Sequence, residues 1–170
     1  MASEALPAQY MKAGREYLDA LVKLGLHPEF LGWGQQHHTR QWMLVLVTST
    51  VEIGGPLAMN ELLFKAYNMN ATPKEISPFI VRVFGSKTLI APELKSLNQM
   101  RPGMLTVQKI DEHTGKPTGK VTPIESYGRD FGDIHIESRD VYVVAPRRQS
   151  HEKRTQEWLR FKDNVERLAA

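Results

Sequence analysis

The segment Trp42–Val47 constrains the fold of this chain more than any other part of the sequence. All six residues are apolar, and an extended segment of this kind is apolar on both of its faces. The segment is far shorter than the roughly 20 residues that a membrane-spanning helix needs. We therefore predict a strand that is covered on both sides, and we expect it to be the central strand of a sheet.

Helical patterns flank this strand. Apolar residues recur at three- and four-residue steps over residues 7–26, which predicts an amphipathic helix. Pro56 suits the first turn of a second helix, which the pattern extends to Asn68. A third helix is expected to begin after Ser150 as its N-cap and to continue to Leu168.

The connections carry turn signals. Residues 28–39 contain a Gly-Trp-Gly sequence and two adjacent histidines, which we interpret as a loop or short turn. A short helical turn is expected to begin at Thr72, with Glu75 in the capping-box position, and to end before Pro78.

The second half of the chain is richer in strand signals than the first. Residues 111–119 have the composition of a long hairpin tip. A short helix is expected at residues 91–100. The expected strands are residues 79–84, 104–110 and 121–127, followed by 133–137 and 141–145 as one bent strand or two short ones.

This order of elements predicts an α+β fold: one domain spanning residues 1–170, with helices packed on a mostly antiparallel sheet of about five to six strands. A winged-helix arrangement stays open as the alternative. In it, residues 56–78 would form two short helices and the hairpin of residues 104–127 would be the wing. The brevity of the second helix argues against that alternative.

Composition removes several classes of function. The chain has no cysteine, so it has no disulfide framework, thiolate metal site or cysteine nucleophile. We expect a cytoplasmic protein without membrane segments or cofactors. The formal net charge of +3 comes entirely from the residues after Ala145, which include seven basic and four acidic residues. Residues 147–170 are thus expected to form a basic amphipathic C-terminal helix.

One strand-like segment carries candidate catalytic residues. On a strand, Asp133, His135 and Glu137 would share one face, where two carboxylates and an imidazole would lie within reach of a divalent cation. The same pattern also arises on any strand with one face in water. His37 and His38, adjacent on the preceding loop, are further candidate metal ligands together with His135.

A second group of residues is predicted to bind macromolecules. Trp33, flanked by glycines in the expected loop, is the candidate for an exposed aromatic anchor. The other candidates belong to the C-terminal segment, where basic side chains would meet phosphates and an aromatic residue would face a core or a partner. They are Arg147, Arg148, Lys153, Arg154 and Trp158.

Three functions therefore remain open on the sequence alone. The favoured one is a small non-catalytic protein that acts through contacts with a protein partner. The second is nucleic-acid binding through the basic C-terminal helix. The third is a metal-dependent hydrolase that uses Asp133, His135 and Glu137.

Overall fold

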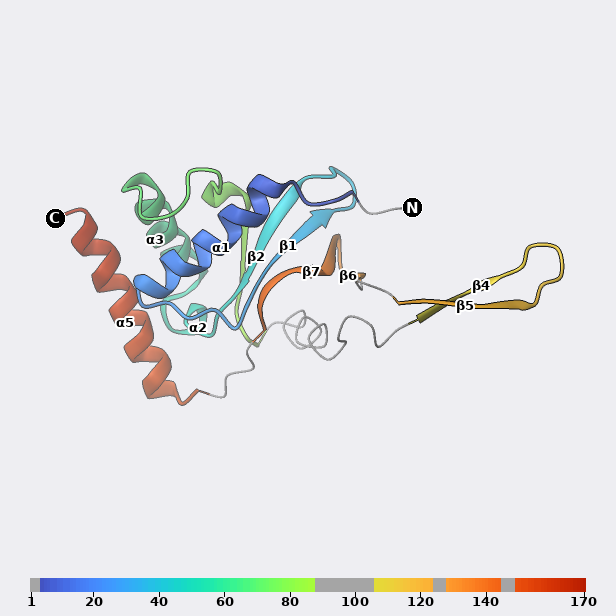
Figure 1. Ribbon diagram of the computed structural model, residues 1–170. Helices are drawn as coiled ribbons and strands as arrows, with labels where there is room; N and C mark the ends of the chain where they lie inside the picture. The colour runs from blue at the N-terminus through green and yellow to red at the C-terminus, as the bar shows by residue number, and fades with distance from the viewer. Residues whose placement is uncertain (1–3, 88–105, 124–127, 145–148) are drawn as a thin grey trace.

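The computed structural model describes residues 4–87, 106–123, 128–144 and 149–170 (Figure 1). The helices are α1 (Ala8–Lys23), α2 (Val51–Gly54), α3 (Pro56–Asn68) and α5 (His151–Leu168), with a 3-10 turn η1 (Pro78–Ile80). The strands are β1 (Phe30–Gln36), β2 (Trp42–Val47), β3 (Val81–Phe84), β4 (Thr106–Ile110), β5 (Pro117–Pro123), β6 (Gly128–Phe131) and β7 (Ile134–Val144). The predicted α+β class is confirmed.

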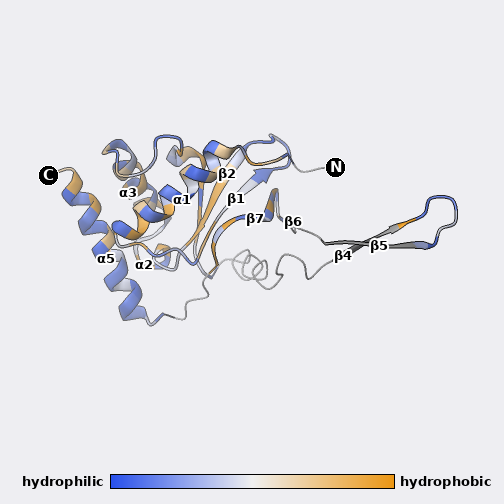
Figure 2. Cartoon of the chain, in the orientation of Figure 1, coloured by the Kyte–Doolittle hydropathy of each residue, from blue (hydrophilic) through white to orange (hydrophobic). Residues whose placement is uncertain are grey.

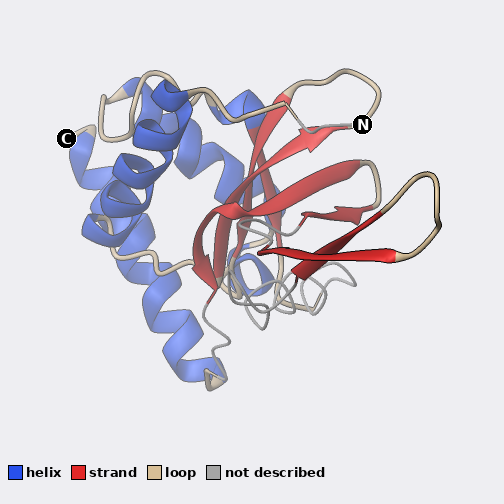
Figure 3. Ribbon diagram, turned by 45° about the vertical axis from the view of Figure 1, so that its right-hand side comes forward, coloured by secondary structure: helices blue, strands red, loops and turns tan. Residues whose placement is uncertain are grey.

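Five strands form one sheet in the order β3-β2-β1-β7-β6. Every neighbouring pair is antiparallel except β2 and β3, which are parallel. The expectation of a mostly antiparallel sheet with helices packed on it is thus confirmed. Helices α1, α3 and α5 gather on one side of this sheet, as Figure 3 shows.

The strand predicted at Trp42–Val47 forms with those bounds, but its expected central position is wrong. The middle strand is β1, which lies in the segment that the sequence analysis assigned to a loop. Two glycines weaken the strand pattern of β1 in the sequence. Because they have no side chains, the neighbouring strand β7 can pack closely on β1. A Cβ atom on Gly34 would collide with the side chains of Ile134 and Ile136 on β7.

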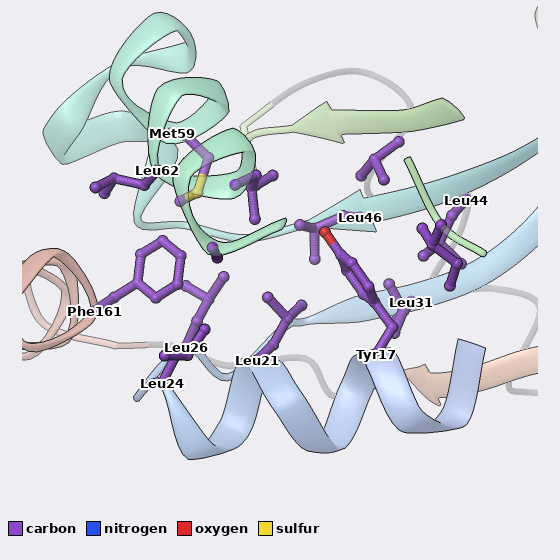
Figure 4. Close-up of a cluster of buried hydrophobic side chains, with 14 of the residues drawn as sticks. Tyr17, Leu21, Leu24, Leu26, Leu31, Leu44, Leu46, Met59, Leu62 and Phe161 are labelled. Atoms are coloured by element: carbon purple, nitrogen blue, oxygen red, sulfur yellow. The ribbon is translucent and has the colours of Figure 1, made fainter. Parts of the chain in front are cut away.

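Strand β2 is buried on both faces, as predicted, because its side chains alternate between two apolar clusters. Leu44 and Leu46 join the cluster beneath the helices, whereas Val45 and Val47 join the cluster on the opposite face. Figure 2 shows the hydrophobic character of this strand. Figure 4 shows the helix-side cluster, to which α1, α3 and α5 all contribute side chains, among them Tyr17, Met59 and Phe161.

Helix α5 is docked on the rest of the fold. Its predicted apolar stripe is buried at Trp158, Phe161 and Val165, while Leu168 in the last turn is 36% exposed. The indole of Trp158 packs so closely on Gly54 that a Cβ atom there would collide with the atoms of its ring. Ser150 is the N-cap, as predicted, and its hydroxyl accepts from the backbone N–H of Lys153 at 3.3 Å.

The region between α3 and β3 differs from the expectation. No helix begins at Thr72; the chain makes turns there, and Pro78 opens the 3-10 turn η1 instead of ending a helix. Since the second short helix of the winged-helix alternative is missing and a five-stranded sheet is present, that alternative is wrong. The predicted hairpin is present as β4 and β5, which form a separate two-stranded sheet. The helix expected at residues 91–100 lies outside the described residues.

Strands β6 and β7 form a tight hairpin, whereas the sequence predicted one bent strand or two short ones at residues 133–137 and 141–145 and no strand at residues 128–131. The chain turns at Gly132 and Asp133, and Gly132 adopts a positive φ of 63°. Asp133 therefore lies in the turn, and β7 runs without a break from Ile134 to Val144. The turn pairs Asp130 with His135 across the two strands.

Candidate functional site

The β6–β7 hairpin places a histidine between two carboxylates. Nδ1 of His135 donates to Oδ1 of Asp130 at 2.6 Å, and Nε2 of His135 donates to Oε1 of Glu137 at 3.0 Å. His37, at the end of β1, adds its Nε2 at 3.2 Å from the same oxygen of Asp130. We call His37, Asp130, His135 and Glu137 the histidine cluster.

The electrostatics of this cluster favour a charged imidazole. Desolvation lowers the pKa of His135, but the hydrogen bonds to Asp130 and Glu137 and the charges of both carboxylates outweigh it, so this pKa lies above its usual value. The hydrogen bond from His135 in turn lowers the pKa of Asp130. In its protonated form His135 donates through both ring nitrogens, and it then offers no lone pair to a metal or to a substrate proton.

The predicted trio of Asp133, His135 and Glu137 is only partly brought together. His135 and Glu137 are in contact, but Asp133 accepts a hydrogen bond from Nε2 of Gln36 at 2.7 Å in the turn. This hydrogen bond lowers the pKa of Asp133. Asp130, which the sequence analysis did not select, takes its place beside His135. The Gly-Asp pair flanked by apolar residues is a two-residue hairpin signal that would have placed Asp130 opposite His135.

The predicted metal ligands do not assemble into a metal site. Within the described residues, no group of three or more His, Asp or Glu side chains has a geometry that would hold a metal ion. His38 is exposed in the β1–β2 turn and contributes no hydrogen bond to the histidine cluster among those described. The residues of the histidine cluster are thus held together by hydrogen bonds and ion pairs with one another.

Trp33 is buried, so the expectation of an exposed aromatic anchor in a loop is wrong. Its side chain has no accessible surface and stacks on Tyr10, with ring centroids 5.0 Å apart. The indole N–H lies 3.1 Å from both the carbonyl oxygen of Tyr10 and the hydroxyl of Tyr142. Trp33, on β1, thus contacts both α1 and β7.

The basic residues predicted to meet phosphates are differently placed. Arg147 and Arg148 lie outside the described residues, and Lys153 is exposed in the first turn of α5. Arg154 is largely buried, and its Nη1 donates to Oε2 of Glu52 at 2.7 Å. Arg154 therefore fixes α5 to α2, and Trp158 is buried beside it.

The two most exposed large apolar side chains that the structure describes lie on the outer side of α3 and in η1 next to it. Leu57 and Phe79 are 72% and 80% exposed, the highest values among the large hydrophobic side chains that the structure describes. Phe79 packs edge-to-face on Phe64, with ring centroids 5.0 Å apart. Met69, just after the helix, is 43% exposed.

Leu57, Phe64 and Met69 line a groove of about 630 Å³, and Phe79 lies next to it through its contact with Phe64. We call it the α3 groove; its lining residues are Leu57, Asn60, Glu61, Phe64, Lys65, Asn68, Met69 and Ala169. A smaller hollow of about 480 Å³ runs along α1 and is also mostly apolar; its lining residues are Leu18, Asp19, Val22, Lys23, His27, Pro28 and Val143. The α3 groove is the larger of the two and the one that the most exposed apolar side chains flank.

The sequence contains a pattern that predicts this groove, although the sequence analysis above did not consider it. Met59, Leu62, Leu63 and Ala66 form the buried side of α3. Leu57 and Phe64 are seven residues apart, two helical turns, and lie on the opposite side of the helix. An apolar pair on the outer side of an amphipathic helix is unexplained by the core and indicates a further contact.

Two further findings concern membrane-spanning helices and similarity to known proteins. None of the helices in the described ranges combines the length and apolar character needed to cross a bilayer. Comparison of the chain with protein-family models, with curated proteins and with solved structures finds no match.

Proposed function

We propose that this chain is a non-catalytic protein that acts by binding another polypeptide through the α3 groove. The observation that carries the proposal is the pairing of the groove with Leu57 and Phe79, which leave most of their side-chain surface in water. Contiguous exposed apolar surface next to a hollow is typical of protein-binding sites.

The groove has the composition of an interface centre. Leu57, Phe64 and Met69 supply most of its apolar area, and polar side chains of α3 line it beside them. Phe79 adds exposed aromatic surface next to the groove, where it packs on Phe64. Interfaces commonly have such an apolar centre with a polar rim, and aromatic anchors carry much of their binding energy. The absence of cysteine fits a reducing compartment, and we propose that the interaction takes place in the cytoplasm.

The two other functions have less support. For the hydrolase, the ring nitrogens of His135 are both engaged by carboxylates, and Asp133 lies apart from the cluster. For nucleic-acid binding, Arg154 forms an ion pair with Glu52, so its charge is already compensated within the chain. No contact in the described residues favours either function over polypeptide binding.

A photo-crosslinking residue placed in the living cell tests the proposal. With the crosslinker in place of Phe79, we expect irradiation to join the chain to one polypeptide, which mass spectrometry identifies. The matched control carries the crosslinker at Met11, an exposed apolar residue of α1 that is 45% accessible.

The captured polypeptide must then bind the purified chain, and Leu57→Glu must weaken that binding. Equal crosslinking from positions 79 and 11, or unchanged affinity of Leu57→Glu, would contradict the proposal. Since Leu57 is mostly exposed, this substitution is expected to leave folding intact.

A further inference from the structure

We infer that the polypeptide that occupies the α3 groove is a second copy of this chain, bound across a two-fold axis. This inference rests on the proposed function and names its partner. Three properties of the groove favour a second copy: its shape, its charges and the order of its side chains along α3.

The shape of this surface is self-complementary. A two-fold interface uses the same patch on both subunits, so the patch must supply both a projecting part and a hollow part. Phe79 and Leu57 project, with 80% and 72% of their side chains exposed, and the groove of about 630 Å³ lies directly beside Leu57 and Phe64. One copy therefore carries both parts that such an interface requires.

The charges of the groove are also self-complementary. Its lining contains one acidic side chain, Glu61, and one basic side chain, Lys65, one helical turn further along. Their charges cancel, so the groove does not select a strongly acidic or strongly basic partner. A second copy placed antiparallel brings each Glu61 to a Lys65 of the other chain.

The order of residues along α3 extends this match. Leu57, Glu61, Lys65 and Met69 follow one another at intervals of four residues, which places them along one side of the helix and its end. In an antiparallel pair, the register that opposes Glu61 and Lys65 also opposes Leu57 and Met69. Apolar residues thus meet apolar residues, and opposite charges meet, with Phe64 close to the two-fold axis.

Sedimentation velocity of the full chain over a range of concentrations tests this inference. We expect a concentration-dependent dimer for the wild-type chain. Leu57→Glu is expected to raise the dissociation constant of the dimer at least about thirtyfold, because each of the two symmetric Leu57–Met69 contacts would gain a buried charge. Met11→Glu, on an exposed apolar residue of α1, is the matched control and is expected to leave the dimer unchanged.

A charge exchange tests the register itself. Glu61→Lys and Lys65→Glu each place like charges opposite one another in a dimer of identical variants, and each is expected to raise the dissociation constant roughly tenfold. Mixing the two variants creates a heterodimer in which both cross-chain pairs are again opposite. The mixture is expected to dimerise within about threefold of the wild type. Each chain keeps its like-charged pair within α3, so a local effect on the helix cannot produce this recovery.

The outcomes separate the inference from the proposed function. A wild-type chain that stays monomeric, or a dimer that Leu57→Glu does not weaken, overturns the inference. If the crosslinker at position 79 then captures a different polypeptide that rebinds the purified chain, the proposed function still holds. If it captures none, both fail. Failure of the mixed charge variants to recover overturns the antiparallel register and with it the argument for a second copy.

Discussion

The histidine cluster and the α3 groove differ in how far their side chains already have partners within the chain. In the histidine cluster, Asp130 and Glu137 engage both nitrogens of His135. In the α3 groove, Leu57 and Phe79 leave most of their apolar surface in water. Groups that already satisfy one another have little to offer a ligand, whereas uncovered apolar surface gains free energy when a partner covers it. The contrast shows why reactive residue types alone do not locate a functional site.

The largest expected effect is on binding at the groove. Leu57→Glu should weaken the association of the chain by roughly a hundredfold, because losing an apolar contact and desolvating a charge together cost about 2 to 3 kcal/mol. At a concentration where both proteins are monomeric, the free energy of unfolding should change by no more than about 0.5 kcal/mol, since this side chain is mostly exposed. Sedimentation and urea denaturation measure the two quantities. A large loss of stability with unchanged association would reverse the assignment.

The next effect concerns α5, whose end contributes Ala169 to the groove. Gly54→Ala should lower the free energy of unfolding by about 2 kcal/mol, because the added methyl group would overlap the indole of Trp158. Urea denaturation measures this change. Trp158→Leu in the same chain should recover part of the loss by making room. Additive losses in the double variant would show that the contact is not the cause.

A smaller effect is expected in the histidine cluster. His135→Gln removes the charge between Asp130 and Glu137 and should lower the free energy of unfolding by about 1 kcal/mol, because the site is partly open to solvent. Association should not change. Reduced association of this variant at unchanged stability would give the cluster the binding role that we assign to the groove.

The smallest effect is the pH dependence of stability. Because the pKa of His135 is raised on folding, its contribution is fully present below the unfolded value of about 6.5 and is lost as the pH rises through the folded pKa. The pKa of Asp130 is lowered, so its contribution is lost as the pH falls below its usual 3.8. The cluster therefore stabilises the fold most between these values. Urea denaturation of His135→Gln should show a weaker pH dependence above pH 6.5.

The elements with strong local signals were predictable from sequence. Helix α1 shows a regular apolar period, β2 is apolar on both faces, and α5 begins after a Ser150 cap, so each was recognised. Strand β1 was missed because Gly32 and Gly34 weaken a strand pattern, and their use depends on a neighbour. That neighbour is β7, whose side chains fill the space that the glycines leave.

The candidate site was less predictable, for a physical reason. The sequence shows which residues are reactive, but their pairing depends on the hairpin turn at Gly132, which brings Asp130 to His135. The exposure of Leu57 depends on which side of α3 the core occupies, and that becomes visible only with the buried residues in place. Tertiary packing decided both cases.

The most direct test of the account compares the two surfaces by thiol labelling. The chain has no cysteine, so Leu57→Cys in the groove and His38→Cys beside the histidine cluster each introduce one unique thiol. We expect maleimide to label position 57 much more slowly in an extract of cells that produce the chain than in the dilute purified protein, and to label position 38 equally fast in both. Protection of position 38 with free labelling of position 57 would contradict the claim that the α3 groove is the binding surface.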